Sequence, residues 1–305
     1  MDRKLLGVIL TLIIVFAFFL GLVYIGGNVL GVERLKTGER PLLRFVFVAI
    51  GLLAAFLLYY FTKQNKAWTV GTREVVYMAI GAALYAVFSY LFNGTVFVVP
   101  SVSQVALRPA ICIPMFFGYV FGPVVGFFTG AVGNMVGDAL TGFGLYPQWS
   151  LGNGLIGLIA GIPMLFADKK KSLDTVLIIG AVLAAIVTAL FAANRTVENQ
   201  MVYPTATITG LAGWSLVIGF VLVLIVRFAF GKDIDVATAV TWGMLGIIIG
   251  LGFAALSDIW INGYPPLVAI VGEFLPAAGP DLIFGAILVP ILIFAYKALQ
   301  RQTGR

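Results

Sequence analysis

The chain has no histidine and only one cysteine among its 305 residues. The lack of histidine removes the commonest metal ligand and general base, and the single Cys112 excludes both a disulfide framework and a thiolate metal site. Charged residues are also scarce, at 10%, whereas hydrophobic residues make up 61% and the mean hydropathy is +1.07. No soluble domain of this length would have such a composition. We therefore expect a membrane protein that has neither a cofactor nor a metal site.

Motifs for ATP binding and for catalysis are missing as well. The sequence Gly231-Lys232-Asp233 lacks the hydroxyl residue and the glycine spacing of a phosphate-binding loop. No nucleophile elbow, HExxH motif or CxxC motif occurs. We predict that the chain is not an enzyme, and that any ATP-driven work would require separate ATPase subunits.

Apolar segments of membrane-spanning length recur along the whole chain. They predict an all-α fold, a polytopic membrane helical bundle with about ten transmembrane helices. The segments cover residues 5–30, 41–62, 74–99, 108–121, 123–145, 150–167, 173–193, 209–230, 237–258 and 281–298.

Positive charge collects on one side of this predicted bundle. With ten crossings and a cytoplasmic N-terminus, the cytoplasmic ends carry 13 of the 19 Lys and Arg residues: Arg3, Lys4, Lys63, Lys66, Arg73, Lys169, Lys170, Lys171, Arg227, Lys232, Lys297, Arg301 and Arg305. Such a bias is typical of cytoplasmic loops. We expect a multi-pass protein of a prokaryotic plasma membrane with both termini cytoplasmic, and the net charge of +6 then reflects topology rather than nucleic-acid binding.

A polar linker at residues 62–72 divides the chain into two parts. Residues 1–72 are predicted to form an accessory N-terminal transmembrane hairpin and its linker, and residues 73–305 a substrate-binding membrane core. The first apolar run continues to about Leu30, so it is too long for a signal peptide and indicates an uncleaved helix.

The first helix of the predicted core has a face of small residues. Ala79 and Ala83, like Ala82 and Ala86, are separated by four positions, so each pair stacks along the helix and permits close packing. The pattern fits either packing within this chain or docking to another subunit.

The segment 123–145 combines a glycine ridge with polar side chains. Gly126, Gly130, Asn134 and Asp138 recur every four residues and therefore share one face of a helix. A polar group in hydrocarbon costs several kcal/mol unless it finds a partner. Asn134 and Asp138 are therefore candidates for a ligand site, the alternative being that they hold helices together.

An aromatic outward loop and a third polar residue follow this helix. Tyr146 and Trp149 lie in the loop, and Asn153 begins another run of small residues at a spacing of four. Aromatic rings above a polar groove suit a flat, hydrogen-bonding ligand. The alternative for Tyr146 and Trp149 is an aromatic belt at the membrane interface.

The later part of the chain has polar groups of its own on the predicted outward side. Arg195, Glu198, Asp258 and Glu273 are further candidates for substrate binding. Intramembrane carboxylates also mark proton pathways in transporters, so Asp138, Asp258 and Glu273 leave open a proton-coupled secondary transporter.

Three segments in order resemble a known family: AIGAALYAV, then LRPAICIPMFFGYVFGPVVGFFTGAVGNMVGDALTG, then an aromatic loop and NGLIGLIAG. Together they are similar to the substrate-binding S component of energy-coupling factor (ECF) transporters, and within that family to its riboflavin-transporter-like members. The resemblance covers about residues 74–165, and the C-terminal PDLIFGAILVPILIFAYKAL more loosely. The family usually has six helices, fewer than the ten predicted here.

The resemblance implies a function and partners. It implies a membrane-embedded subunit that captures a vitamin or related small molecule at the outer face, and then docks to a transmembrane T subunit carrying two ABC-type ATPases. It implies that the alanine motif makes this contact, through Ala79, Ala82, Ala83 and Ala86. It implies that the substrate site includes Asn134, Asp138, Tyr146, Trp149 and Asn153.

Overall fold

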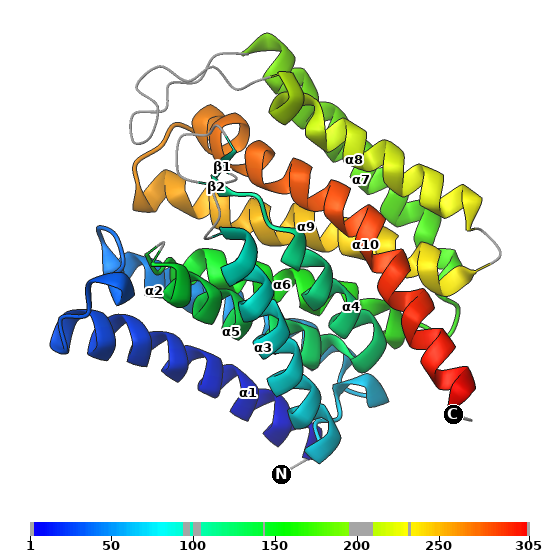
Figure 1. The fold of residues 1–305 in the computed structure, drawn as a ribbon, viewed down its shortest axis with the longest axis horizontal. Coiled ribbons are helices and arrows are strands. Elements are labelled where there is room, and N and C mark those ends of the chain that lie inside the picture. Colours follow the sequence, from blue (N-terminus) through cyan, green and yellow to red (C-terminus); the bar gives the residue numbers. More distant parts are fainter. Residues whose placement is uncertain are drawn as a thin grey trace.

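A computed structural model describes residues 3–93, 98–99, 105–142, 144–194, 210–230 and 233–303 (Figure 1). These residues form ten α-helices, one pair of short strands, and several 3₁₀ and π segments. In chain order the elements are α1 (Arg3–Leu20), the π-helix η1 (Gly21–Val29), η2 (Glu33–Leu35), α2 (Pro41–Thr62), η3 (Lys66–Trp68), α3 (Thr72–Asn93), β1 (Val98–Val99), β2 (Val105–Ala106), η4 (Pro109–Ile111), α4 (Cys112–Phe121), α5 (Pro123–Thr141), α6 (Pro147–Ala160), η5 (Ile162–Leu165), α7 (Lys169–Ala193), α8 (Gly210–Ala229), α9 (Ile234–Ile261), the π-helix η6 (Val268–Phe274) and α10 (Leu275–Gln302).

Each of the ten predicted apolar segments contains a helix, so the predicted all-α helical bundle is confirmed. In the described part of the chain, seven helices are long and apolar enough to cross a membrane, and α4 and α8 are shorter apolar helices. The number of crossings therefore stays a prediction. One detail was wrong: α3 ends at Asn93, and residues 98–99 pair with 105–106 as antiparallel strands instead of extending the helix.

Proline, aspartate and glycine set several helix ends. Pro123 and Pro147 occupy the first turns of α5 and α6, where the missing backbone N–H costs no hydrogen bond. The carboxylates of Asp168 and Asp233 accept hydrogen bonds from backbone N–H groups in the first turns of α7 and α9. Gly122 has φ = 111°, a conformation that favours glycine, and it turns the chain from α4 into α5.

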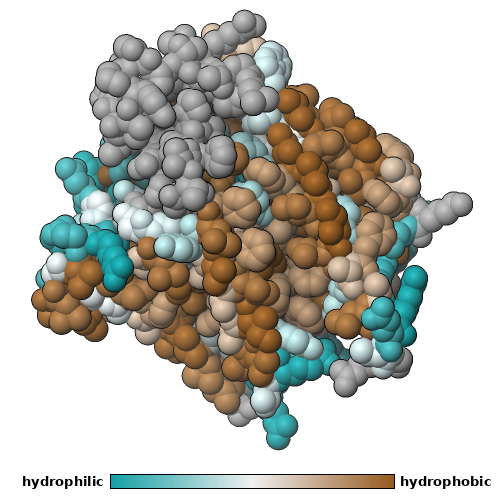
Figure 2. Space-filling model, in the orientation of Figure 1, coloured by the Kyte–Doolittle hydropathy of each residue, from teal (hydrophilic) through white to brown (hydrophobic). Residues whose placement is uncertain are grey.

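The helices run between two ends of the bundle, and α1 begins at the end where α10 finishes (Figure 1). The other end, which we call the loop end, holds the connections at residues 30–40, 144–146 and 262–267. On the visible face, hydrophobic side chains cover the middle of the bundle and hydrophilic ones gather toward its ends (Figure 2). Together with the long apolar helices, this distribution identifies a multi-pass membrane protein.

The central element is α6, which packs against α5 on one side and α9 on the other. A Cβ atom added at Gly157 of α6 would overlap the carbonyl oxygen of Gly126 in α5. One added at Gly250 of α9 would overlap the carbonyl oxygen of Gly152 in α6. The backbones therefore touch on both sides. Because α6 is enclosed by protein, its 14 residues do not have to match the roughly 20 residues of a lipid-exposed spanning helix.

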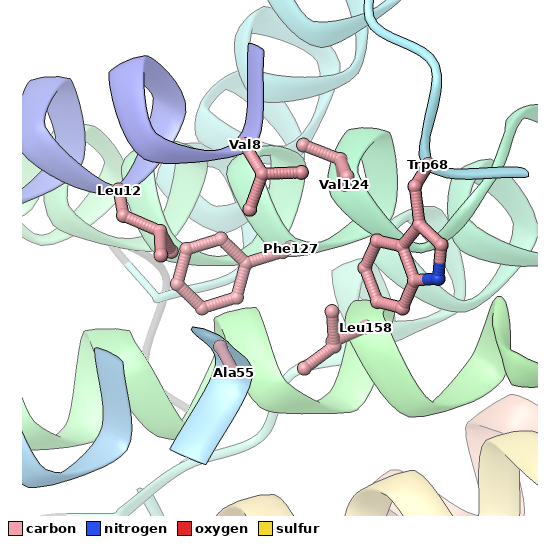
Figure 3. Close-up of a pocket in the computed structure, with 7 residues that line it drawn as sticks. All are labelled: Val8, Leu12, Ala55, Trp68, Val124, Phe127 and Leu158. Carbon is pink, nitrogen blue, oxygen red and sulfur yellow. The ribbon is translucent and has the colours of Figure 1, made fainter. Parts of the chain in front are cut away.

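The N-terminal hairpin of α1 and α2 covers one side of this core. Side chains from the hairpin, the linker, α5 and α6 point toward one another around a cavity of about 10 Å³ (Figure 3): Val8, Leu12, Ala55, Trp68, Val124, Phe127 and Leu158. The lining is apolar, and the volume is about that of one water molecule. This cavity is a packing gap rather than a ligand site.

The contact between α5 and α6 can be tested by adding a single methyl group. Gly126→Ala would place a Cβ against the Gly157 carbonyl, and overpacking of this kind costs about 1–3 kcal/mol. The expected result is a clear fall in the thermal unfolding midpoint in detergent. Gly252→Ala in α9 is the matched control, because its Cβ would meet only the Phe274 ring at 3.8 Å. Equal midpoints for the two variants would contradict the backbone contact.

Candidate functional site

A buried polar network connects α3, α5 and α6 toward the loop end. We call it the Arg108 network, and its members are Tyr85, Arg108, Asn134, Asp138, Ser150 and Asn153. The Arg108 side chain is the most exposed of them, at 14%. The others are at most 5% exposed as residues, so their polar groups depend on one another for hydrogen bonds.

The centre of the network is an ion pair between Arg108 and Asp138. Arg108 Nη2 donates to Asp138 Oδ1 over 3.1 Å, and its Nη1 donates to Asn134 Oδ1. Asn134 Nδ2 donates in turn to Asp138 Oδ2 over 2.8 Å and to Ser150 Oγ over 2.9 Å. Asn134 and Asp138 lie one turn apart on α5, so a single guanidinium reaches both.

Tyr85 and Asn153 extend the network across α3 and α6. The Tyr85 hydroxyl donates to Asn153 Oδ1 over 2.8 Å and lies 3.4 Å from Asn134 Oδ1. Asn153 Nδ2 donates to the backbone carbonyl of Trp149 over 3.0 Å. Donors and acceptors from three helices therefore converge on one point, as in sites that fix the orientation of a polar ligand.

A second polar cluster lies on the side of α6 that faces α9. We call it the Asp258 network, with members Arg44, Gln148, Trp149, Asp258 and Glu273. Trp149 Nε1 donates to Asp258 Oδ2 over 2.8 Å, and Gln148 Nε2 donates to Asp258 Oδ1 over 3.2 Å. Glu273, on η6, lies within hydrogen-bonding reach of Asp258.

Arg44 enters this second network from the hairpin. Its side chain donates to the backbone carbonyl of Glu39 over 3.0 Å and to Asn262 Oδ1 over 3.2 Å. Its guanidinium lies 5.1 Å from the centroid of the Tyr146 ring. Burial raises the pKa of the nearby Tyr264 phenol above its ordinary value, and the charges of Glu273 and Asp258 raise it further, so this group stays neutral.

Most of the residues predicted to bind substrate are distributed between the Arg108 network and the Asp258 network. Asn134, Asp138 and Asn153 come together, as expected. Trp149 and Tyr146 do not cover them: the Trp149 indole binds Asp258, and the Tyr146 ring lies against a guanidinium. Arg195 and Glu198 lie outside the described residues.

Arg108 was missed as a site residue. Its signal is an arginine directly before the apolar run of α4, where a charge needs a partner. The partner is 30 positions away along the chain, and sequence spacing alone does not identify it.

The four alanines of the α3 motif lie on two different sides of the helix, one buried and one exposed. Ala82 and Ala86 are buried, at 7% and 3% exposure, on the side where Gly133 and Gly137 of α5 approach. Ala79 and Ala83 lie on the exposed side of the helix. The inner pair therefore packs within the chain, and of these four alanines the outer pair is the accessible one. Docking of the outer pair to a partner stays a prediction.

Comparison with known proteins agrees with this architecture. A sequence model of the family described as "ECF-type riboflavin transporter, S component" matches residues 69–227, more than half of the chain. The protein is thus a polytopic transport component by class. It belongs to the ECF-type riboflavin transporter S component family, a family of substrate-binding membrane subunits rather than enzymes.

Several curated bacterial proteins are similar to part of the chain. A UPF0397 protein of Vibrio atlanticus is 38% identical over 100 residues, which are 32% of this chain and 53% of that protein. One from Aliivibrio fischeri is 36% identical over 104 residues (34% and 55%), and one from Photobacterium profundum is 39% identical over 92 residues (30% and 48%). The chain spans about half the length of these relatives. No solved structure matches it significantly.

The matched range contains the whole Arg108 network and the alanine face of α3. Arg44, Asp258 and Glu273 lie outside it. The two networks therefore differ in their relation to the family as well as in their position around α6.

The ion pair at the centre of the Arg108 network makes a prediction about stability. Arg108→Met would leave Asp138 buried without its counter-charge, and breaking a buried pair in this way costs about 3–5 kcal/mol. We expect a large fall in the thermal midpoint in detergent, with part of the loss recovered in the double variant Arg108→Met/Asp138→Leu. Additive effects in this double-mutant cycle would show that the two side chains do not interact.

Proposed function

We propose that this protein captures a vitamin or a related small molecule at the outer face of a prokaryotic plasma membrane. It would then deliver the molecule by docking to a transmembrane T subunit that carries two ABC-type ATPases. The observation that carries the proposal is the Arg108 network, a set of converging buried donors and acceptors inside the family-matching part of an otherwise apolar bundle.

The chemistry of the network suits a flat ligand with several hydrogen-bonding groups. Arg108 supplies donors, Asp138 supplies acceptors, and the amides of Asn134 and Asn153 supply both. Without a ligand these groups satisfy one another, and a ligand that offers the same pattern would exchange with them. Tyr146 and Trp149 lie at the start of α6, before Ser150 and Asn153 of this site; their rings contact the Asp258 network, so a role in ligand binding would require them to move.

The orientation in the membrane is part of the proposal. The end where α1 begins and α10 finishes carries most of the lysines and arginines, and such residues are enriched in cytoplasmic loops. We place both termini in the cytoplasm and the loop end outside. The substrate site then lies toward the outer face.

We further propose that residues 1–72 form an accessory hairpin on a core of residues 73–305. The family match begins at residue 69, within the linker between α2 and α3. The hairpin contacts the core through apolar side chains and through Arg44.

Ligand binding can be tested with Asn134→Ala. Removing this amide would leave ligand groups unpaired, which costs about 1–3 kcal/mol, or roughly tenfold or more in affinity. Titration of the purified variant with the native ligand, released from the wild-type protein by denaturation and identified by mass spectrometry, measures the effect. Ser257→Ala is the control, since among the described residues its hydroxyl donates to the Ala254 carbonyl in α9 and to no member of the Arg108 network. Unchanged affinity for Asn134→Ala would exclude the Arg108 network as the substrate site.

Docking can be tested on the two faces of α3. Ala83→Trp adds bulk to the exposed side, and we expect ligand binding by the isolated chain to persist while co-purification with a T subunit and its ATPases is lost. Ala82→Trp adds the same bulk to the buried side, so it is expected to damage folding and binding together. If Ala83→Trp still forms the complex, the docking face lies elsewhere. Uptake by the chain alone in proteoliposomes, driven by a pH gradient, would instead support a secondary transporter.

A further inference from the structure

Asp258 and Glu273 form a pair of buried carboxyl groups outside the family-matching range. Both residues are 1% exposed, one on α9 and the other on η6. Gln148 and Trp149 donate hydrogen bonds to the two oxygens of Asp258 from the facing side of α6. The pair is therefore held in place and kept from water.

The contact between the two carboxyl groups requires a proton. Glu273 lies within hydrogen-bonding reach of Asp258. An ionised carboxylate can only accept hydrogen bonds, so two ionised groups cannot bond to each other. When one of them is protonated, its O–H donates to the other, and the pair titrates as a unit.

The charges around the pair also indicate that the two carboxyl groups hold one proton between them. Arg44 is the cation that faces it among the described residues, and Tyr146 and Tyr264 are the other titratable groups nearby. Two carboxylates and one guanidinium leave a net charge of −1 in a buried site, and one proton brings the sum to zero.

The helices packed on η6 add no further charge at this point. The Lys and Asp residues of α7 lie within its first six positions, at the opposite end of the bundle. In α10, the carboxyl group of Asp281 interacts with Arg108 instead.

Two atoms of the Asp258 network are left without hydrogen-bond partners in the described part of the chain. Gln148 is 0% exposed, and its Oε1 has no hydrogen-bond partner among the described residues. Nη1 of Arg44, a residue that is 2% exposed, is also without a partner there. An open acceptor and an open donor thus belong to residues of the Asp258 network, and a water molecule next to either atom would satisfy it.

We propose that Asp258 and Glu273 form a proton-binding site at the loop end of the bundle, with one shared proton and with Arg44 as its counter-charge. We also propose that this proton regulates the substrate site. Gln148 and Trp149 directly precede Ser150 on α6, so loss of the proton would disturb both faces of the same helical turn. The regulatory part rests on the proposed function, whereas the proton site itself does not.

Infrared spectroscopy of the ligand-free protein in detergent tests the proton site. At neutral pH we expect a C=O stretching band of a protonated carboxyl group that disappears in both Asp258→Asn and Glu273→Gln. Glu273→Gln keeps a donor toward Asp258 and the zero net charge, so it is expected to fold. Asp174→Asn, whose side chain is 80% exposed, is the control that should leave the band unchanged. The band of Asp281, another buried carboxyl group, is identified with Asp281→Asn.

A second variant and a sodium titration make the test decisive. In Arg44→Gln the counter-charge is gone, so both carboxyl groups are expected to be protonated and the band to double. A wild-type band that survives in both Asp258→Asn and Glu273→Gln would overturn the proton site. Loss of the band on addition of sodium chloride at constant ionic strength would overturn it too, in favour of a sodium site.

The regulatory part has its own measurement. The affinity of the wild-type protein for its native ligand should fall as the pH rises until the pair is deprotonated, and Glu273→Gln should remove this dependence. A wild-type affinity independent of pH would refute regulation while leaving the infrared result intact. If no ligand binds at all, the proposed function fails, and the infrared test still decides the proton site.

Discussion

The contact of the α6 backbone with α5 on one side and α9 on the other is the constraint on which the rest of the structure depends. In lipid there is little hydrophobic driving force between helices, so their association relies on close packing. Gly126 and Gly157 provide it on one side, and Gly152 and Gly250 on the other. The result is a helix with no lipid-facing surface apart from the partly exposed Trp149.

This enclosure explains why α6 can carry so many polar side chains. Successive residues of a helix point in directions about 100° apart, so neighbouring positions on one turn face different helices. Gln148 and Trp149 meet α9, whereas Ser150 and Asn153 meet α5 and α3. Each of these four side chains makes at least one hydrogen bond within the protein, and two separate networks arise from about one and a half turns of the same helix.

The sequence was sufficient for features that depend on local spacing. The apolar segments predicted the positions of the helices. The four-residue spacing predicted that Asn134 and Asp138 share a face of α5, and in the structure the two side chains are hydrogen-bonded to each other. Asn153 joined them as expected, because its helix packs on that face.

Features that depend on which helix covers which face were not predictable in this way. The pairing of Trp149 with Asp258 spans 109 positions, and nothing in the loop around Trp149 indicates it. The alanines of α3 could not be divided into inner and outer pairs, because small residues suit either side until the position of α5 is known. The strands at 98–99 and 105–106 were missed because a short apolar run has no period that separates strand from helix.

The parts of the chain before and after the family match, residues 1–68 and 228–305, meet through opposite charges. Within the match, Asp138 has Arg108 as its counter-charge, and both residues lie in the matched range. The later carboxyl groups, Asp258 and Glu273, instead face Arg44 of the N-terminal hairpin. A buried carboxylate is strongly unfavourable without a nearby cation, so the hairpin contributes the counter-charge that allows one carboxyl group of this pair to stay ionised, as well as an apolar surface. The N-terminal hairpin and the C-terminal helices are therefore linked by charge as well as by apolar contact, because the guanidinium of one faces the carboxyl groups of the other.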